Sequence, residues 1–147
     1  MQLKEIKFSR FKGQPNEWAI EGRPQEGKFE QWLSFDKITL ITGKNASGKT
    51  KTVDAIRYIA DLLSGDVQLF QLALLGYGTA EYHLKFNDND NLIEYHLDFK
   101  DGKVSQEILS IDGQVKLDRV KGKLWYEGAG KELDFETYRY KNKRQAE

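Results

Sequence analysis

The chain has 147 residues, and its 23 Lys and Arg residues balance its 23 Asp and Glu residues, so the formal net charge is zero. The absence of cysteine excludes a disulfide scaffold and any zinc or iron–sulfur site with cysteine ligands. The balanced charge argues against a domain that binds nucleic acid by electrostatic attraction, since such domains usually carry a basic excess. With 39% hydrophobic and 12% aromatic residues, the composition is that of a globular protein.

Neither a targeting segment nor a membrane segment is evident. The first seven residues alternate charged and apolar side chains, which is the opposite of a signal peptide. The longest mostly apolar stretch, Leu69 to Leu75, is far shorter than the roughly 20 residues that a membrane-spanning helix needs. We therefore expect a cytoplasmic protein with no membrane partner.

The first third of the sequence predicts a β-hairpin and then one buried strand. Residues 3–11 alternate apolar and polar side chains, with a slip at Lys4-Glu5 that indicates a β-bulge. Residues 18–20 are expected to return as the second strand, and the polar residues 22–31 predict a loop. The β-branched, mostly apolar run 37–42 predicts a strand buried on both faces, as in a parallel or mixed sheet.

A helix is predicted after the glycine-rich stretch 43–48, and Ser64-Gly65 is its expected end. Apolar residues at spacings of three and four form one stripe of an amphipathic helix. These residues are Val53, Ile56, Ile59, Ala60 and Leu63. Residues 69–75 fit either a second short helix or a buried strand.

The second half of the chain predicts an antiparallel meander. Strict alternation over 82–86 and 93–99 indicates two strands of a hairpin, in which His83 faces His96 on the polar side. Asp-Gly pairs are typical of tight hairpin turns, and they occur at 101–102 and 112–113. Three further strands are expected, near residues 103–111, 114–120 and 123–126.

One motif carries chemistry. Residues 43–50, Gly-Lys-Asn-Ala-Ser-Gly-Lys-Thr, fit the phosphate-loop (Walker A) pattern G-x-x-x-x-G-K-[ST] between a predicted strand and a predicted helix. Gly43 and Gly48 permit a close backbone approach that a Cβ would block, and inward N–H groups form an anion nest at the positive end of the helix. Lys49 is expected to reach the β- and γ-phosphates, and the Thr50 hydroxyl to ligate Mg²⁺. The alternative is a glycine-rich turn that binds nothing.

The first 65 residues resemble the ATP-binding-cassette (ABC) ATPases of the RecF, SMC and OLD kind. The segment 3–13 looks like the first strand of that group, 38–50 is similar to its G-x-N-[GA]-x-G-K-[ST] form, and 52–56 resembles the helix that follows. The resemblance implies a P-loop NTPase fold of the α/β class with α+β character. The chain would be an N-terminal lobe, with a mixed sheet around the Walker A helix and an antiparallel β-meander.

The resemblance also implies ATP and Mg²⁺ as cofactors. The phosphate and magnesium ligands that it implies are Gly43, Asn45, Gly48, Lys49 and Thr50, and the residues that supply loop backbone are Lys44, Ala46, Ser47 and Lys51. Of these, Thr50 is the implied metal ligand. Arg10 and Lys12 lie where such proteins often bring basic residues near the nucleotide, although a solvated strand end explains them equally well.

Several motifs of such an ATPase are missing from the sequence. No apolar strand ends in Asp-Glu, the Walker B pattern: the closest run, 108–112, is followed by Gly113 and fits a strand entering a turn. The Leu-Ser-Gly-Gly signature and the switch histidine have no match, and a Q-loop glutamine cannot be assigned. We therefore predict that the Walker B and signature motifs lie outside this chain and that the chain alone is inactive, with ATP hydrolysis expected of the full-length protein.

The resulting expectation is one N-terminal ATP-binding lobe. Residues 1–65 would form its strands, loop and helix, 78–136 an antiparallel β subdomain, and 137–147 a tail or cut edge. The implied partners are the nucleotide, the remainder of the ATPase domain and a second head that sandwiches ATP, while a DNA or nuclease partner is left open. The alternative function is a non-catalytic protein-interaction domain with a structural or vestigial loop. A complete small kinase or GTPase would need a magnesium carboxylate, for which only Asp112 is even superficially placed.

Two smaller features have two interpretations each. His83 and His96, with Glu81 and Asp98 nearby, combine imidazole and carboxylate groups that suit zinc. A solvent-facing polar side of the hairpin is the commoner arrangement. The tryptophans Trp18, Trp32 and Trp125 can stack on adenine, although packing in a core is their more frequent role.

Overall fold

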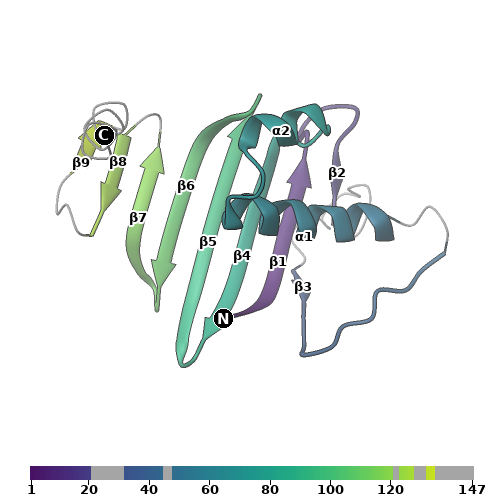
Figure 1. Cartoon of the computed structure of the whole chain (residues 1–147), viewed down its shortest axis with the longest axis horizontal. Helices are drawn as coiled ribbons and strands as arrows, with labels where there is room; N and C mark the ends of the chain where they lie inside the picture. Colours follow the sequence, from purple (N-terminus) through teal and green to yellow (C-terminus); the bar gives the residue numbers. More distant parts are fainter. Residues whose placement is uncertain (21–31, 45–47, 121–122, 128–131, 135–147) are drawn as a thin grey trace.

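The computed structural model describes residues 1–20, 32–44, 48–120, 123–127 and 132–134. The predicted loop 22–31 and the polar tail 139–147 lie outside these residues. The chain forms one sheet with two helices on one of its faces (Figure 1). Each strand pairing in the described part of the chain is antiparallel, so the fold is mixed α+β.

The strands of the sheet are β1 (Gln2–Arg10), β2 (Trp18–Ala19), β3 (Leu33–Ser34), β4 (Ala80–Asp88), β5 (Asn91–Lys100), β6 (Lys103–Ile111), β7 (Gln114–Val120), β8 (Lys123–Tyr126) and β9 (Glu132–Asp134). Their order is β2-β1-β4-β5-β6-β7-β8-β9, and β3 also pairs with β1. The helices are α1 (Lys49–Ser64) and α2 (Leu69–Leu74). Neither described helix combines the length and apolar character needed to cross a bilayer.

The N-terminal hairpin is confirmed. β2 pairs antiparallel with the end of β1, with Ser9 opposite Ala19, and the register of β1 against β4 shifts between Leu3 and Glu5. That shift is the bulge predicted from the break in alternation. Both β2 and β3 lie along the same edge of β1, so they cover the edge that faces away from β4.

The meander and its register are also confirmed. His83 lies opposite His96 in the β4–β5 pair, and Lys85 lies opposite Glu94. The two Asp-Gly turns join β5 to β6 and β6 to β7. Asp112 and Gly113 both have positive φ, 49° and 76°, which is the geometry of the hairpin turn that this dipeptide favours. The short strand β9 extends the sheet beyond the predicted elements.

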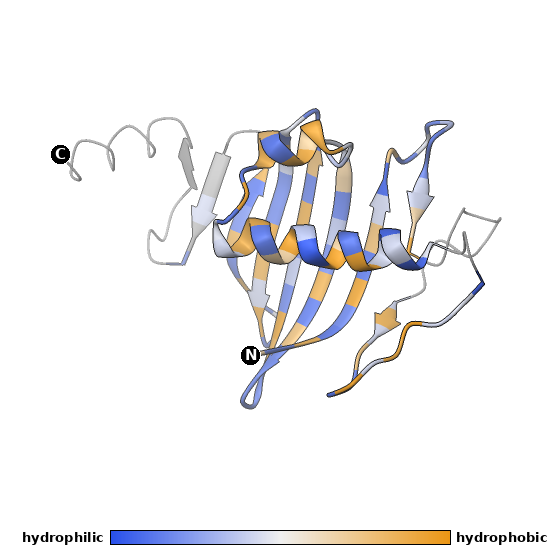
Figure 2. Ribbon diagram, turned by 45° about the vertical axis from the view of Figure 1, so that its right-hand side comes forward, coloured by the Kyte–Doolittle hydropathy of each residue, from blue (hydrophilic) through white to orange (hydrophobic). Residues whose placement is uncertain are grey.

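The core lies between α1 and one face of the sheet (Figure 2). Because strand side chains alternate between faces, Phe8, Tyr82 and Phe99 all point to the helix side, and each is at most 2% exposed. The Tyr82 hydroxyl donates a hydrogen bond of 3.1 Å to the carbonyl of Ala55 in α1. One buried polar contact and an aromatic layer thus fix the helix on the sheet.

The predicted apolar stripe of α1 is only partly correct. Its buried residues are Thr52, Ala55 and Ile59, whereas Val53 is 51% exposed and Leu63 is 49% exposed. The physical reason is the layer of aromatic rings on the sheet. Where α1 comes closest to the sheet, these rings leave room only for a small side chain such as Ala55. Gly65 ends the helix as expected, with φ +84°. The ambiguous segment after it forms the helix α2.

The predicted buried strand over residues 37–42 does not form, and this prediction is wrong. Ile38 is 92% exposed and Leu40 is 83% exposed, and residues 37–43 have no strand partner within the described part of the chain. A strand requires a neighbour for its backbone groups, and the nearest sheet edge is already covered by β2 and β3. The expectation of a mixed sheet around the helix fails for the same reason, since no parallel pair is found among the described residues.

The buried phenol of Tyr82 gives a test of this packing. Burial raises the pKa of Tyr82, and likewise that of Tyr95. A raised folded-state pKa contributes stability that is present below the unfolded value of about 10 and is lost as the pH rises above it. We predict that Tyr82→Phe lowers the free energy of unfolding by about 1 kcal/mol at pH 7 through the lost hydrogen bond. The gap between variant and wild type should shrink near pH 11, as measured by urea unfolding. Tyr95 is present in both proteins, so a gap that is constant with pH would contradict the assignment.

Candidate functional site

The described residues of the Walker A pattern lie around the start of α1. The helix begins at Lys49, directly after Gly48, whose φ of +91° lies in the left-handed region that a Cβ disfavours. No side chain caps this end, and its first turn has no acidic residue. The first-turn N–H groups, which have no partner within the helix, therefore meet no competing side-chain acceptor in the described part of the chain. This end of the helix carries a partial positive charge.

The side chain of Lys49 bends back toward the first two residues of the motif. Its ammonium donates hydrogen bonds to the carbonyl oxygens of Gly43 and, at 3.1 Å, of Lys44. The side chain thereby joins the first glycine of the motif to the helix that follows the second glycine. The Lys49 ammonium thus binds two backbone carbonyl oxygens, whereas the sequence motif predicts that it binds phosphate oxygens.

The structure brings together the six described residues of the motif and its first turn, namely Gly43, Lys44, Gly48, Lys49, Thr50 and Lys51, while Asn45, Ala46 and Ser47 lie outside the described residues. The side chain of Thr50 is exposed, and so is that of Lys44. Lys51 is exposed as well, with its ammonium 5.8 Å from the ring centroid of Trp18. Three lysines therefore gather at one end of the helix in a chain whose total charge is zero.

A cavity of about 350 Å³ adjoins the loop. Residues 39–43 form one wall, Lys49 and Thr52 form another, and Ile20 and Leu33 close it from the N-terminal strands. The hydroxyl of Thr52 donates a hydrogen bond of 3.0 Å to the carbonyl of Gly48. The volume is near the lower end of the range for small-molecule sites.

The Trp18 ring packs against Gly48, a contact that the sequence did not indicate. A Cβ added at Gly48 would lie 3.1 Å from the Trp18 ring, and this indole is only 6% exposed. It also packs against Phe8, with 6.0 Å between ring centroids. Trp18 therefore has the core-packing role and helps to place the second glycine of the motif. No local sequence pattern could reveal this contact, because Trp18 and Gly48 are thirty positions apart.

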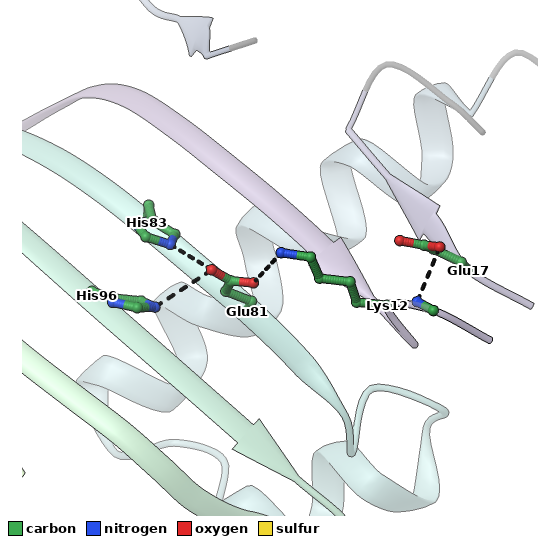
Figure 3. A network of polar contacts seen from close by, with 6 residues as sticks. Lys12, Glu17, Glu81, His83 and His96 are labelled. Carbon is green, nitrogen blue, oxygen red and sulfur yellow. Dashed lines mark hydrogen bonds and ion pairs between the residues drawn. The ribbon is translucent and has the colours of Figure 1, made fainter. Parts of the chain in front are cut away.

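The two basic residues near the end of β1 have other contacts. The guanidinium of Arg10 lies 5.0 Å from the ring centroid of Tyr77. Lys12 approaches Glu81, with 3.5 Å between its ammonium and Oε2 (Figure 3). Glu81 points to the sheet face opposite α1, so Lys12 is drawn away from the loop. Asp112, the remaining candidate for a magnesium carboxylate, instead accepts a hydrogen bond of 2.8 Å from the Leu92 N–H in its turn.

The opposite face of the sheet holds the facing histidines. The rings of His83 and His96 stack with 3.8 Å between centroids, and both Nε2 atoms face the Glu81 carboxylate (Figure 3). The hydrogen bond with His83 is the largest cause that holds the pKa of Glu81 well below its usual range. The sequence prediction that these side chains meet is thus confirmed.

Comparison of the chain with models of protein families, with curated proteins and with solved structures finds no match. The interpretation of the site therefore depends on the motif and on the geometry around α1.

The contact between Gly48 and Trp18 can be separated from backbone strain. Gly65 has a similar φ of +84°, but a Cβ there meets nothing within 4 Å. We predict that Gly65→Ala lowers the free energy of unfolding by about 1–2 kcal/mol, the usual cost of left-handed backbone. Gly48→Ala should cost about 1 kcal/mol more, because the Trp18 ring must also move. Urea unfolding of both variants measures the difference. If both lose the same free energy of unfolding, the Trp18 contact does not contribute to the cost of Gly48→Ala.

Proposed function

We propose that this chain binds ATP with Mg²⁺ through residues 43–51, as the N-terminal lobe of an ABC-type ATPase of the RecF, SMC and OLD group. The observation that carries the proposal is the position of Lys49. Its ammonium lies over the first residues of the motif, beside a helix N-terminus with no side-chain cap. A phosphate chain placed there would meet both the ammonium and the first-turn N–H groups of α1.

The local charges support an anionic ligand. A phosphate offers Lys49 charge-assisted hydrogen bonds, which are stronger than those to the neutral carbonyls of Gly43 and Lys44. Lys44 and Lys51 add positive charge, and Thr50 is an exposed residue whose hydroxyl would serve as an oxygen ligand of Mg²⁺. Bound Mg²⁺ would neutralise charge on the phosphates. In this proposal, Lys49 and the first-turn N–H groups hold the phosphates at the N-terminus of α1.

The proposal assigns the missing catalytic parts to polypeptide other than residues 1–147. Phosphoryl transfer to water needs a carboxylate that orients the nucleophile and a second contact to the metal. Asp112, the one candidate for this carboxylate in the sequence, accepts a hydrogen bond from the Leu92 N–H. We further propose that the complete protein is a cytoplasmic ATPase and that two such heads enclose the nucleotide. DNA and nuclease partners stay open within this proposal.

The role of Lys49 gives the direct test. We predict that isothermal calorimetry detects Mg-dependent ATP binding and that Lys49→Ala weakens it by about 100-fold, since charge-assisted hydrogen bonds are lost. Lys103→Ala is the matched control, because this exposed lysine of β6 lies outside the motif, and the affinity of that variant should stay within about threefold of wild type. Equal affinities of the Lys49→Ala variant and wild type would refute the proposal.

The isolated chain should bind ATP without turning it over. The physical reason is that the sequence contains no apolar strand ending in Asp-Glu, the pattern that would supply the water-activating carboxylate. A phosphate-release assay with saturating ATP and Mg²⁺ is expected to show no turnover above the protein-free rate, both for wild type and for the Lys49→Ala variant. Steady turnover that disappears in that variant would show that the chain contains its own catalytic carboxylate.

A non-catalytic interaction domain is the second candidate. It is favoured by the large apolar side chains on the surface: Leu74 of α2 is 83% exposed and Phe70 is 58% exposed. In this alternative the loop is structural, and Lys49 simply ties it to α1. The calorimetric experiment separates the two functions, because the alternative requires that neither ATP nor another nucleotide binds.

A further inference from the structure

On the face of the sheet away from α1, three metal-ligating side chains converge. Glu81 and His83 are on β4, and His96 faces His83 from β5. Each offers one ligand atom, and these atoms all lie within 4.8 Å of one another. They have no part in the nucleotide site proposed above, which lies on the other side of the sheet.

The spacing of these atoms fits one ion. Glu81 Oε1 is 2.8 Å from His83 Nε2 and 3.6 Å from His96 Nε2. Zinc binds imidazole nitrogen and carboxylate oxygen at about 2.0–2.2 Å, so neighbouring ligands of a tetrahedral site are about 3.3–3.5 Å apart. The two separations lie on either side of that range, and the stacked rings, now 21° from parallel, must tilt apart for both nitrogens to point at one ion.

The polar contacts within the cluster are incomplete. At 3.6 Å, His96 Nε2 is too far from Glu81 for a hydrogen bond, and this buried atom has no hydrogen-bond partner in the described structure. One divalent ion satisfies both nitrogens and the carboxylate at once.

The surroundings of the cluster also suit a bound ion. Lys12 contacts the second carboxylate oxygen of Glu81, and the Trp32 ring packs edge-on against His83 at 6.2 Å. These contacts orient two of the ligands, as outer-shell partners do. A cavity of about 370 Å³ adjoins the cluster at Glu81, and Lys12 and Asp98 are among the other residues that line it.

We propose that Glu81, His83 and His96 form a site for a divalent transition metal, with Zn²⁺ the ion that this set of ligands suits best. Two imidazoles and one carboxylate leave a fourth position for water. Because the ligands come from neighbouring strands, the ion would fasten β4 to β5. Mg²⁺ is disfavoured, since it prefers an all-oxygen octahedral shell.

The test uses the full chain without an affinity tag, stripped of metal with a chelator. Calorimetry with Zn²⁺ should show one ion per chain. His96→Gln should weaken binding by more than about 100-fold, since even outer-shell partners are worth 10- to 100-fold. Glu81→Gln should also weaken it, whereas Glu94→Gln, the matched carboxylate change on the same face of β5, should not. Lys49→Ala should leave zinc binding unchanged, which separates this site from the nucleotide site.

A measurement on the wild type makes the result independent of how the variants fold. The chain has two histidines, so Zn²⁺ should shift the imidazole ¹⁵N resonances of both in the NMR spectrum. Zinc binding that leaves either resonance in place would overturn the proposal. So would the absence of a one-to-one complex, or equal zinc affinity in wild type and a folded His96→Gln variant.

Discussion

The contact between α1 and the aromatic face of the sheet determines where everything else lies. Tyr82 reaches from the middle of β4 to the carbonyl of Ala55, and Ala55 is fully buried. Because a helix is rigid, fixing its centre also fixes its first turn, two turns before Ala55. Gly48 then rests on Trp18, and the ammonium of Lys49 falls over the start of the loop. The arrangement of the phosphate-loop residues is thus a consequence of core packing.

The period of two in the strands divides the molecule into two chemical environments. On β4, Tyr82 and Leu84 face the helix and form the core, while Glu81 and His83 face the other way. The same alternation gives β1 an apolar side with Ile6 and Phe8. A single sheet therefore supports two separate sets of polar groups: a cationic set at the end of α1, and an imidazole–carboxylate set behind it.

The parts of the fold that depend on local signals could be predicted. The Asp-Gly turns and strict alternation define the meander, and the register that places His83 opposite His96 follows from them. The local pattern was not enough for residues 37–42. Apolar β-branched residues favour a strand, but they do not show whether a neighbouring strand is present to pair with it. Residues 69–75 are too short to show a period. The support of Gly48 by Trp18 joins distant positions, so only the folded structure reveals it.

The strand pairings of the sheet differ in the length of chain that each one closes. The strands β4, β5, β6 and β7 are joined by turns of two residues, so each of these pairings closes over a short length of chain. β1 is different, since it pairs Gln2 with Asn87 and Arg10 with Ala80. Contacts of such large sequence separation form slowly, because the loop between them loses conformational entropy before any contact is gained. Residues 43–51 lie within that loop, so we expect their arrangement to be completed only when β1 docks beside the meander.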